Sequence, residues 1–164
     1  MKYRYGFIAF LIAFLLQSSV LHNISLFGVA PNLVLVLVIV SSFLFDELHG
    51  AVFGILFGLL QDMFFSDFVG ISAIAYFLVA LAVMEAKRYL YRDNYLSVIF
   101  ISVGGTLGYN IIYWLISGIF GGIHQFIFML AMQPVAIIYN TILVFILYWI
   151  IIRKVIKYRG FKYM

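Results

Sequence analysis

The chain has 164 residues, of which 66% are hydrophobic, 20% aromatic and 10% charged. Soluble domains are nearer half apolar and a quarter charged, so this composition excludes a soluble fold and predicts an integral membrane protein. The chain has no cysteine, which excludes disulfides and thiolate chemistry, and its net charge is +4. The basic residues flank apolar runs, as contacts to anionic lipid headgroups do, and nucleic acid is therefore not an expected partner.

Six apolar runs predict an all-α integral membrane protein, a six-transmembrane-helix bundle that forms a single membrane-embedded domain over residues 1–164. The second and fourth runs are shorter than the ~20 residues that cross a bilayer straight. We expect such short spans to thin the bilayer or to be partly buried by their neighbours. The predicted spans cover residues 5–21, 33–45, 48–65, 71–84, 95–117 and 134–152.

Two prolines set helix boundaries in this prediction. Pro31 is placed to start the second span, because its missing N–H is no loss in the first turn of a helix. Pro134 interrupts the last apolar region, residues 126–152. Proline removes a helix hydrogen bond and clashes with the preceding turn, so a kink or a new helix start is expected there. We predict a short re-entrant or interfacial piece before Pro134 and the sixth span after it.

The basic residues predict the orientation of the bundle. With six spans, two Lys or Arg residues precede the first span, three lie between the fourth and fifth, and five follow the sixth. All ten fall on one side, which the positive-inside rule makes cytoplasmic, so both termini are predicted inside. Six of these residues are candidates to face cytoplasmic partners or anionic lipid. They are Lys87, Arg88, Arg92, Arg153, Lys154 and Lys157.

A strip of glycines marks the third span. Gly50, Gly54 and Gly58 recur every four residues, and Asp62 continues the series. Residues four apart are neighbours on a helix, so the glycines form a slanting strip without side chains that ends in a carboxylate. In lipid such a strip lets another helix approach closely. The strip either receives a helix of a partner or packs helices of this bundle, and the sequence leaves both open.

Two further pairs of small residues, four apart, offer weaker close-approach surfaces. Ala9 and Ala13 form one in the first span, and Gly104 and Gly108 form the other in the fifth. Asp62 is the only acidic residue inside an apolar run, about one turn from the outer end of its span. It either caps a helix end near headgroup water or has a buried structural or binding role.

No residue pattern predicts catalysis. The histidines His22, His49 and His124 lie in different predicted loops, so neither a metal site nor another cofactor is expected. Four amides lie within or beside the apolar runs, and we interpret them first as interhelical hydrogen-bond partners. These are Gln17, Asn110, Gln133 and Asn140. A small binding cavity near Gln17, Asp62, Gln133 and Asn140, at the outer side, is the alternative interpretation.

Several motifs together span nearly the whole chain. They are Gln17-Ser18-Ser19, Pro31-Asn32-Leu33, the series of Gly50, Gly54, Gly58 and Asp62, Gly70-Ile71, Pro134 and Asn140. In these motifs the chain resembles the MreD family of rod shape-determining membrane proteins. Members of that family often have Asp after the first proline, whereas this chain has Asn32. The difference argues against an essential charge at this position.

The resemblance implies a non-enzymatic, multi-pass scaffold in the bacterial cytoplasmic (inner) membrane. Its expected role is in the cell-elongation machinery, the elongasome, which synthesises peptidoglycan and sets cell shape. The implied partners are the membrane-anchored MreC, the actin-like MreB, and the polymerase RodA with its transpeptidase. The implied fold is related to the substrate-binding components of energy-coupling-factor vitamin transporters. A small-molecule-binding component for vitamin uptake or lipid handling is the alternative function.

Overall fold

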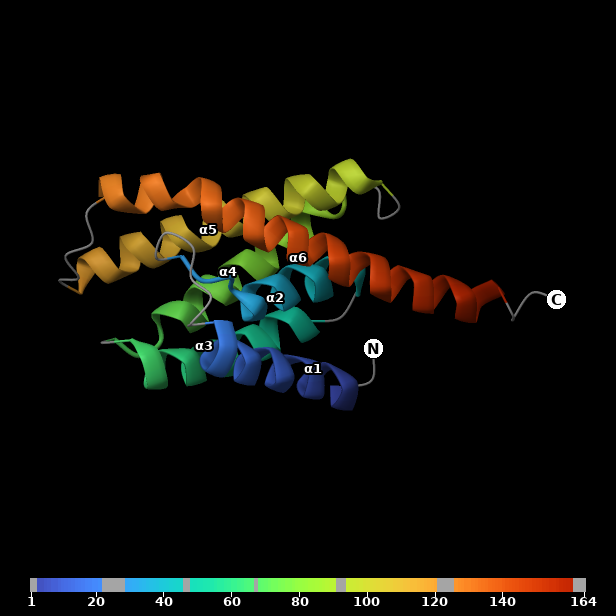
Figure 1. The fold of residues 1–164 in the computed structure, drawn as a ribbon, viewed down its shortest axis with the longest axis horizontal. Coiled ribbons are helices and arrows are strands. Elements are labelled where there is room, and N and C mark those ends of the chain that lie inside the picture. Colours follow the sequence, from blue (N-terminus) through green and yellow to red (C-terminus); the bar gives the residue numbers. More distant parts are fainter. Residues whose placement is uncertain are drawn as a thin grey trace.

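The computed structural model describes residues 3–21, 29–45, 48–66, 68–90, 94–120 and 126–160, and in the last range it describes the side chains of residues 130–152. These residues form six α-helices and one π-helical turn, without a strand (Figure 1). The predicted all-helical class is therefore confirmed. The elements are α1 (Tyr3–Leu16), η1 (Gln17–Leu21), α2 (Leu33–Leu44), α3 (His49–Phe65), α4 (Ile71–Ala86), α5 (Tyr95–Ile119) and α6 (Phe126–Gly160).

The helices begin and end close to the predicted positions. α2, α4 and α5 begin at Leu33, Ile71 and Tyr95, the first residues of the predicted spans. His49, which was assigned to a loop, is the first residue of α3. The apolar runs and their polar interruptions therefore predict the boundaries of these elements well, because the turns carry the asparagine, glycine and charged residues that end helices.

The predicted break at Pro134 is wrong. α6 is one helix from Phe126 to Gly160 with Pro134 inside it. Proline removes one backbone hydrogen bond, but the neighbouring turns keep theirs, so a long apolar helix bends without ending. Figure 1 shows the N-terminal part of α6 running at an angle to the rest of the helix. The residues before Pro134 thus belong to α6 and do not form a separate re-entrant piece.

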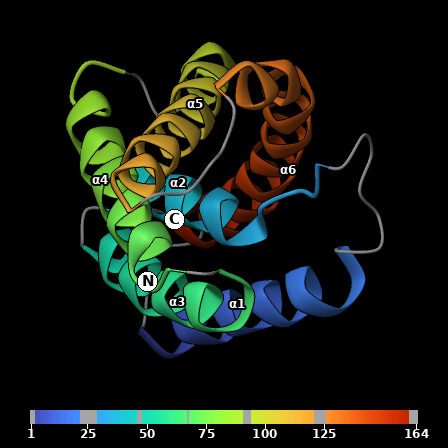
Figure 2. The ribbon, with the colours of Figure 1, turned by 90° about the vertical axis from the view of Figure 1, so that its left-hand side faces the viewer.

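α2 lies at the centre of the bundle. Seen from one end, the other helices surround it, with α3 and α1 on one side and α4, α5 and α6 around the rest (Figure 2). Nine of its twelve residues are buried, from Val34 to Phe43. This position explains why the Val- and Ile-rich sequence of α2 shows no polar face. At 1.5 Å per residue α2 is only about 18 Å long.

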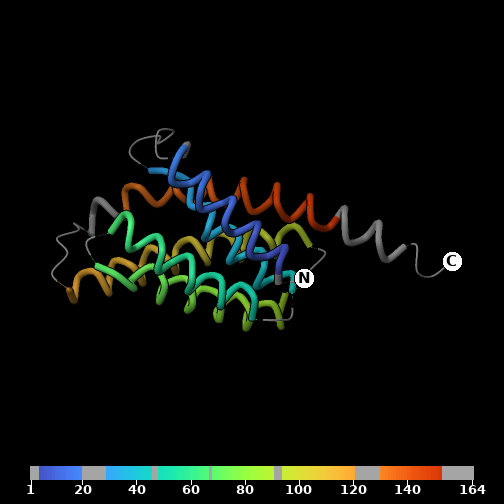
Figure 3. The backbone as a smooth tube through the Cα atoms, turned by 90° about the horizontal axis from the view of Figure 1, so that it is seen from below, coloured from blue at the N-terminus to red at the C-terminus, as the bar shows by residue number. Residues whose placement is uncertain are grey.

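Two helices are long and apolar enough to cross a membrane, judged by length and composition. They are α5, Tyr95–Ile119, and the segment Leu130–Ile152 of α6. α1 to α4 are apolar but shorter. The start of α1 and the end of α6 lie at the same end of the bundle (Figures 1 and 3).

Candidate functional site

A polar network lies at the start of α2. Asn32 is the N-cap of α2, and its Oδ1 accepts a hydrogen bond from the backbone N–H of Leu35 at 2.9 Å. The Tyr76 hydroxyl from α4 lies 2.9 Å from the same oxygen. The backbone N–H of Asn32 donates to Oδ1 of Asn140 in α6 at 3.1 Å. Asn32 thus connects three helices. Pro31 lies one residue before this cap, so the prediction that it starts the helix is wrong, and α2 begins at Leu33.

Two glutamines extend the network toward α1 and α3. Gln17 accepts from the backbone N–H of Val34 at 3.2 Å and donates to Gln61 at 3.3 Å. The Gln61 Oε1 also lies 2.8 Å from the Tyr76 hydroxyl. Since a hydroxyl carries one proton, Tyr76 donates to either Asn32 or Gln61 at any moment. The network therefore joins Gln17 of η1 and the N-cap of α2 to Gln61 of α3 and Tyr76 of α4.

The other amides predicted from the sequence also bond between helices. Asn140 donates to Thr106 of α5 at 3.4 Å, and Asn110 of α5 donates to Gln133 of α6 at 3.0 Å. The interpretation of these amides as interhelical hydrogen-bond partners is confirmed. Each such bond contributes only about 0.6 kcal/mol on average in membranes, so the network orients the helices more than it stabilises them.

The sequence analysis missed the tyrosines of this network. Tyr76 is fully buried, and its ring stacks on Tyr109 with centroids 4.8 Å apart and planes at 15°. The Tyr109 hydroxyl lies 3.3 Å from that of Ser72. Tyrosine in a membrane helix is usually interpreted as an anchor at the membrane–water interface, so a buried role was not predicted. The signal that could have identified Tyr76 is its place in the middle of α4, away from either charged end.

Asp62 holds the start of α4. It is fully buried, and its Oδ2 accepts from the backbone N–H groups of Gly70 at 2.9 Å and Ser72 at 2.8 Å, while Oδ1 accepts from the Ser66 hydroxyl at 3.3 Å. A carboxylate is favourable at a helix N-terminus, where unpaired N–H groups and the helix dipole meet. Of the two interpretations left open, the structure supports the buried structural role, exerted on the next helix.

Replacing the Asn32 cap tests what this residue contributes. Asn32→Ala removes the acceptor for Leu35 and should destabilise the protein by about 1–2 kcal/mol, which lowers the melting temperature by about 2–4 °C per kcal/mol. Asn32→Asp keeps the capping oxygen and should melt close to the wild-type temperature. Thermal unfolding of both variants in detergent measures the difference. Equal losses in both variants would show that Asn32 does not act as a cap.

The glycine strip of α3 packs inside the bundle. A Cβ at Gly58 would lie 2.6 Å from Cα of Ala73 in α4, and one at Gly54 would lie 3.1 Å from side chains of both Tyr76 in α4 and Val38 in α2. A Cβ at Gly50 would meet Ser41 and Ser42 of α2. The strip is therefore occupied by α2 and α4 of the same chain. Of the two interpretations, internal packing fits this structure, and a partner's helix finds no room there.

The small residues of α1 also face the bundle. Ala13 is buried and Ala9 is half-buried. On the same helix Phe10 stacks on Phe57 of α3, with ring centroids 5.6 Å apart. Because α3 covers this face of α1, Ala9 and Ala13 contribute to packing within the chain. The exposed face of α1 carries larger side chains, Tyr5, Ile8, Ile12 and Leu15.

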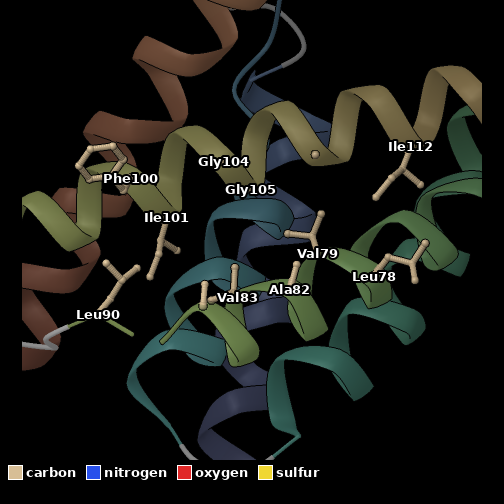
Figure 4. Close-up of a pocket in the computed structure, with 12 residues that line it drawn as sticks. Leu78, Val79, Ala82, Val83, Leu90, Phe100, Ile101, Gly104, Gly105 and Ile112 are labelled. Carbon is tan, nitrogen blue, oxygen red and sulfur yellow. The ribbon is translucent and has the colours of Figure 1, made fainter. Parts of the chain in front are cut away.

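Gly104 and Gly108 of α5 lie differently, on an open groove between α4 and α5 (Figure 4). A Cβ at Gly104 would have no atom within 4 Å, and one at Gly108 would reach only Val79, at 3.8 Å. The close approach of α5 to α2 takes place instead at Gly105, where a Cβ would lie 2.7 Å from Ile39. The groove has a volume of about 450 Å³. Its other lining residues include Leu78, Ala82, Val83, Phe100, Ile101 and Ile112.

The basic residues predicted at the cytoplasmic side have different surroundings. Lys87 Nζ donates to the backbone carbonyls of Ser42 at 3.2 Å and Phe45 at 2.8 Å, so it holds the C-terminal end of α2. Arg88 forms an exposed ion pair with Glu85 at 3.2 Å. Arg92 lies outside the described residues, and so do the side chains of Arg153, Lys154 and Lys157.

Of the four residues predicted to line an outer cavity, only Gln17 lines a cavity in the structure. Gln17 lines a cavity beside α1, together with Asn32 and Gln61. Asp62, Gln133 and Asn140 do not line it, because their side chains are engaged between helices.

Comparison with known proteins gives the family. Searches of curated proteins and of solved structures find no significant match. A family model described as rod shape-determining protein MreD matches residues 2–159, nearly the whole chain. The match covers all six helices, with the polar network, Asp62 and both glycine surfaces. The chain therefore belongs to the MreD family of membrane proteins, which act in rod shape determination.

Proposed function

We propose that this protein is a non-enzymatic scaffold of the bacterial cell-elongation machinery, and that it binds partner membrane proteins through helix packing. Membership of the MreD family supports the role in rod shape. The observation that carries the proposal is the open apolar groove between α4 and α5. Because the glycine strip of α3 is filled from within, this groove is the close-approach surface left for another helix.

The proposed topology has six spans in the cytoplasmic membrane, with both termini in the cytoplasm. Support comes from α1 starting and α6 ending at one end of the bundle (Figure 3). Lys87 and Arg88, between α4 and α5, belong to that same end, because Lys87 bonds to the C-terminal end of α2. Clustered Lys and Arg mark a cytoplasmic side. The short α2 is surrounded by protein, so its length of about 18 Å sets no demand on the lipid around it.

The groove has the features that helix association in lipid requires. Apolar surface alone provides no driving force there, because lipid tails are as apolar as leucine. Close packing does, and it needs positions without side chains. Gly104 supplies one, since no atom of the residues that the structure describes fills the space above it. Around it, Leu78 and Ala82 of α4 and Phe100 of α5 form walls that side chains of a second helix can interdigitate with (Figure 4).

The proposed occupant of the groove is the membrane helix of MreC. RodA and its transpeptidase are proposed to join the same assembly within the membrane, and MreB is proposed to contact the cytoplasmic end. Arg88 is exposed at that end, which also suits contact with anionic lipid headgroups. These partners follow from the family role, and the groove provides a surface for one of them.

Filling the groove should separate partner binding from folding. Gly104→Leu places a side chain in open space, so the protein should fold, while the groove becomes too shallow for a second helix. We expect copurification with MreC from membranes to fall at least tenfold, or about 1.4 kcal/mol. Gly118→Leu is the matched control, because Gly118 lies on the same helix, also has open space above it and does not line the groove.

Three measurements decide the result. Copurified MreC is quantified, the melting temperature of each variant is measured in detergent, and rod shape is scored in cells that depend on the variant. Loss of MreC with Gly104→Leu only, at an unchanged melting temperature, supports the groove. Wild-type copurification with both variants would remove the groove from the proposal, and equal losses with both would assign the effect to α5 in general.

A further inference from the structure

A second cavity, of about 380 Å³, opens between the end of α1, the end of α3 and the segment that precedes α2. It lies at the N-terminal end of α2, whereas Lys87 holds the C-terminal end, so the two mark opposite ends of the bundle. None of its residues belongs to the groove between α4 and α5. Its walls include Phe14, Gln17, Pro31, Asn32, Gln61 and Phe65.

The orientation of the three amides in this cavity is fixed by backbone groups. The N–H of Val34 donates to Gln17, and the N–H of Leu35 donates to Asn32. A backbone N–H can only donate, so the oxygen ends of both amides must face it. The nitrogen of Gln17 then faces Gln61, which sets the oxygen of Gln61 toward Gln17. All three amide oxygens are therefore used within the protein.

Two of the amide nitrogens are left as donors. Within the described part of the chain, Asn32 Nδ2 and Gln61 Nε2 have no hydrogen-bond acceptor. Neither nitrogen is fully buried, so both can reach a bound molecule or water. Both residues line the cavity. An amide NH₂ group carries two donors, so residues of the cavity wall carry N–H groups that can donate to an acceptor bound in the cavity.

The walls limit the chemistry of those contents. Among the described residues, no Lys, Arg, Asp or Glu lines the cavity. Phosphate and carboxylate groups are bound by charge-assisted hydrogen bonds from Arg or Lys, which are missing from this wall. Phe14, Phe65 and Pro31 instead supply apolar faces. This combination suits a neutral group that has several oxygen acceptors and an apolar face, as a hexose ring does.

We infer that this cavity binds a neutral saccharide, either as the headgroup of a glycolipid or as a free sugar. Asn32 and Gln61 donate to its hydroxyl oxygens, and Phe14 and Phe65 pack against its ring. The volume of about 380 Å³ lies near the lower limit of small-ligand pockets, which fits one or two sugar rings. The place of the cavity at one end of the bundle allows a headgroup to enter from the membrane surface. This site is separate from the groove and independent of partner binding.

Two substitutions remove the donors and keep the internal bonds. Gln61→Glu retains an oxygen for Gln17 and Tyr76, and Asn32→Asp retains the cap for Leu35, but each replaces the free NH₂ with an oxygen. Asn94→Asp is the matched control, because Asn94 caps α5 through the N–H of Leu96 and lies outside the cavity. Ala30→Leu is a further variant, which adds bulk to the cavity wall and replaces no amide.

The test measures binding by native mass spectrometry of the full chain in lauryldimethylamine oxide, a detergent without sugar. The probes are diglucosyl diacylglycerol, phosphatidylglycerol with the same acyl chains, and maltose. We expect the glycolipid to bind the wild-type and Asn94→Asp proteins, and to bind at least tenfold more weakly to Gln61→Glu, Asn32→Asp and Ala30→Leu. Binding of maltose as well identifies free sugar as a ligand, and its absence identifies the membrane as the source.

Three results would overturn the inference. They are absence of binding for both sugar probes, equal binding of phosphatidylglycerol, and undiminished binding in the cavity variants. Melting temperatures are recorded for every variant, so a folding defect in one of the amide variants is recognised. In that case Ala30→Leu, which removes no hydrogen-bonding group, decides the question.

Discussion

Asp62→Ala is expected to destabilise this protein more than any other single removal of a polar side chain. The substitution leaves the backbone N–H groups of Gly70 and Ser72 without their acceptor at the start of α4. A hydrogen bond to a charged group contributes about 1.5–3 kcal/mol, so the loss of two amounts to about 3–6 kcal/mol. Such a loss exceeds half the stability of many proteins. We therefore expect little monodisperse protein after extraction in detergent.

Asp62→Asn is the informative comparison. An amide keeps one oxygen for the N–H groups but gives up the negative charge at the helix N-terminus, so an intermediate melting temperature is expected. Ser66→Ala removes the weaker contact to Oδ1, at 3.3 Å, and a contact to the Tyr113 hydroxyl at 3.4 Å, and should change the melting temperature little. A melting temperature for Asp62→Ala equal to that of the wild type would contradict the capping role. Loss of partner binding in a stable Asp62→Ala protein would point to a functional one.

The positions of the helices could be predicted from the sequence because apolar runs and polar turns alternate clearly along it. Leu33, Ile71 and Tyr95 follow asparagine or glycine, which cap helices, and each begins a helix. The extent of α6 could not be predicted in the same way. A proline signals a distortion, but whether the helix ends or bends depends on the packing around it, which the sequence does not contain.

The candidate site could likewise be predicted from the sequence only in part. The amides Gln17, Asn110 and Asn140 could be singled out because polar groups in an apolar run need partners. Their actual partners could not, since Asn32 and Asn140 are 108 residues apart. Tyr76 was not predicted because tyrosine is common at membrane surfaces. Only the fold shows that its hydroxyl lies within hydrogen-bond distance of two amide oxygens.

The glycine spacing predicted a close contact but not its partner. Gly58 and Gly104 each belong to a series spaced by four, and sequence alone treats them alike. The structure separates them, because α4 covers Gly58 and none of the described residues covers Gly104. A periodic strip fixes which residues share a helix face, whereas the neighbour of that face depends on the order of helices in the bundle. The surface proposed to bind a partner is therefore the one that the described residues leave open.

Gly58→Ala is expected to be the most damaging of the single-methyl substitutions at glycines. Its Cβ would lie 2.6 Å from Cα and 2.7 Å from N of Ala73, and both are backbone atoms that cannot rotate away. α3 and α4 would have to move apart, which costs about 1–3 kcal/mol or more, even though alanine favours a helix over glycine by about 1 kcal/mol. Melting temperatures in detergent should fall for Gly58→Ala.

Two other positions complete a graded series. At Gly54 the added Cβ would lie 3.1 Å from Cβ of Tyr76 and from Cγ2 of Val38, whereas at Gly58 it would lie 2.6 Å from a backbone atom. The smaller overlap should make Gly54→Ala milder than Gly58→Ala. At Gly104 the space is open, so Gly104→Ala should melt at or above the wild-type temperature. Purified protein contains no partner, so this order reports packing within the chain. A Gly58→Ala protein as stable as Gly104→Ala would mean that α4 does not cover the strip, and the strip would again be open to a partner's helix.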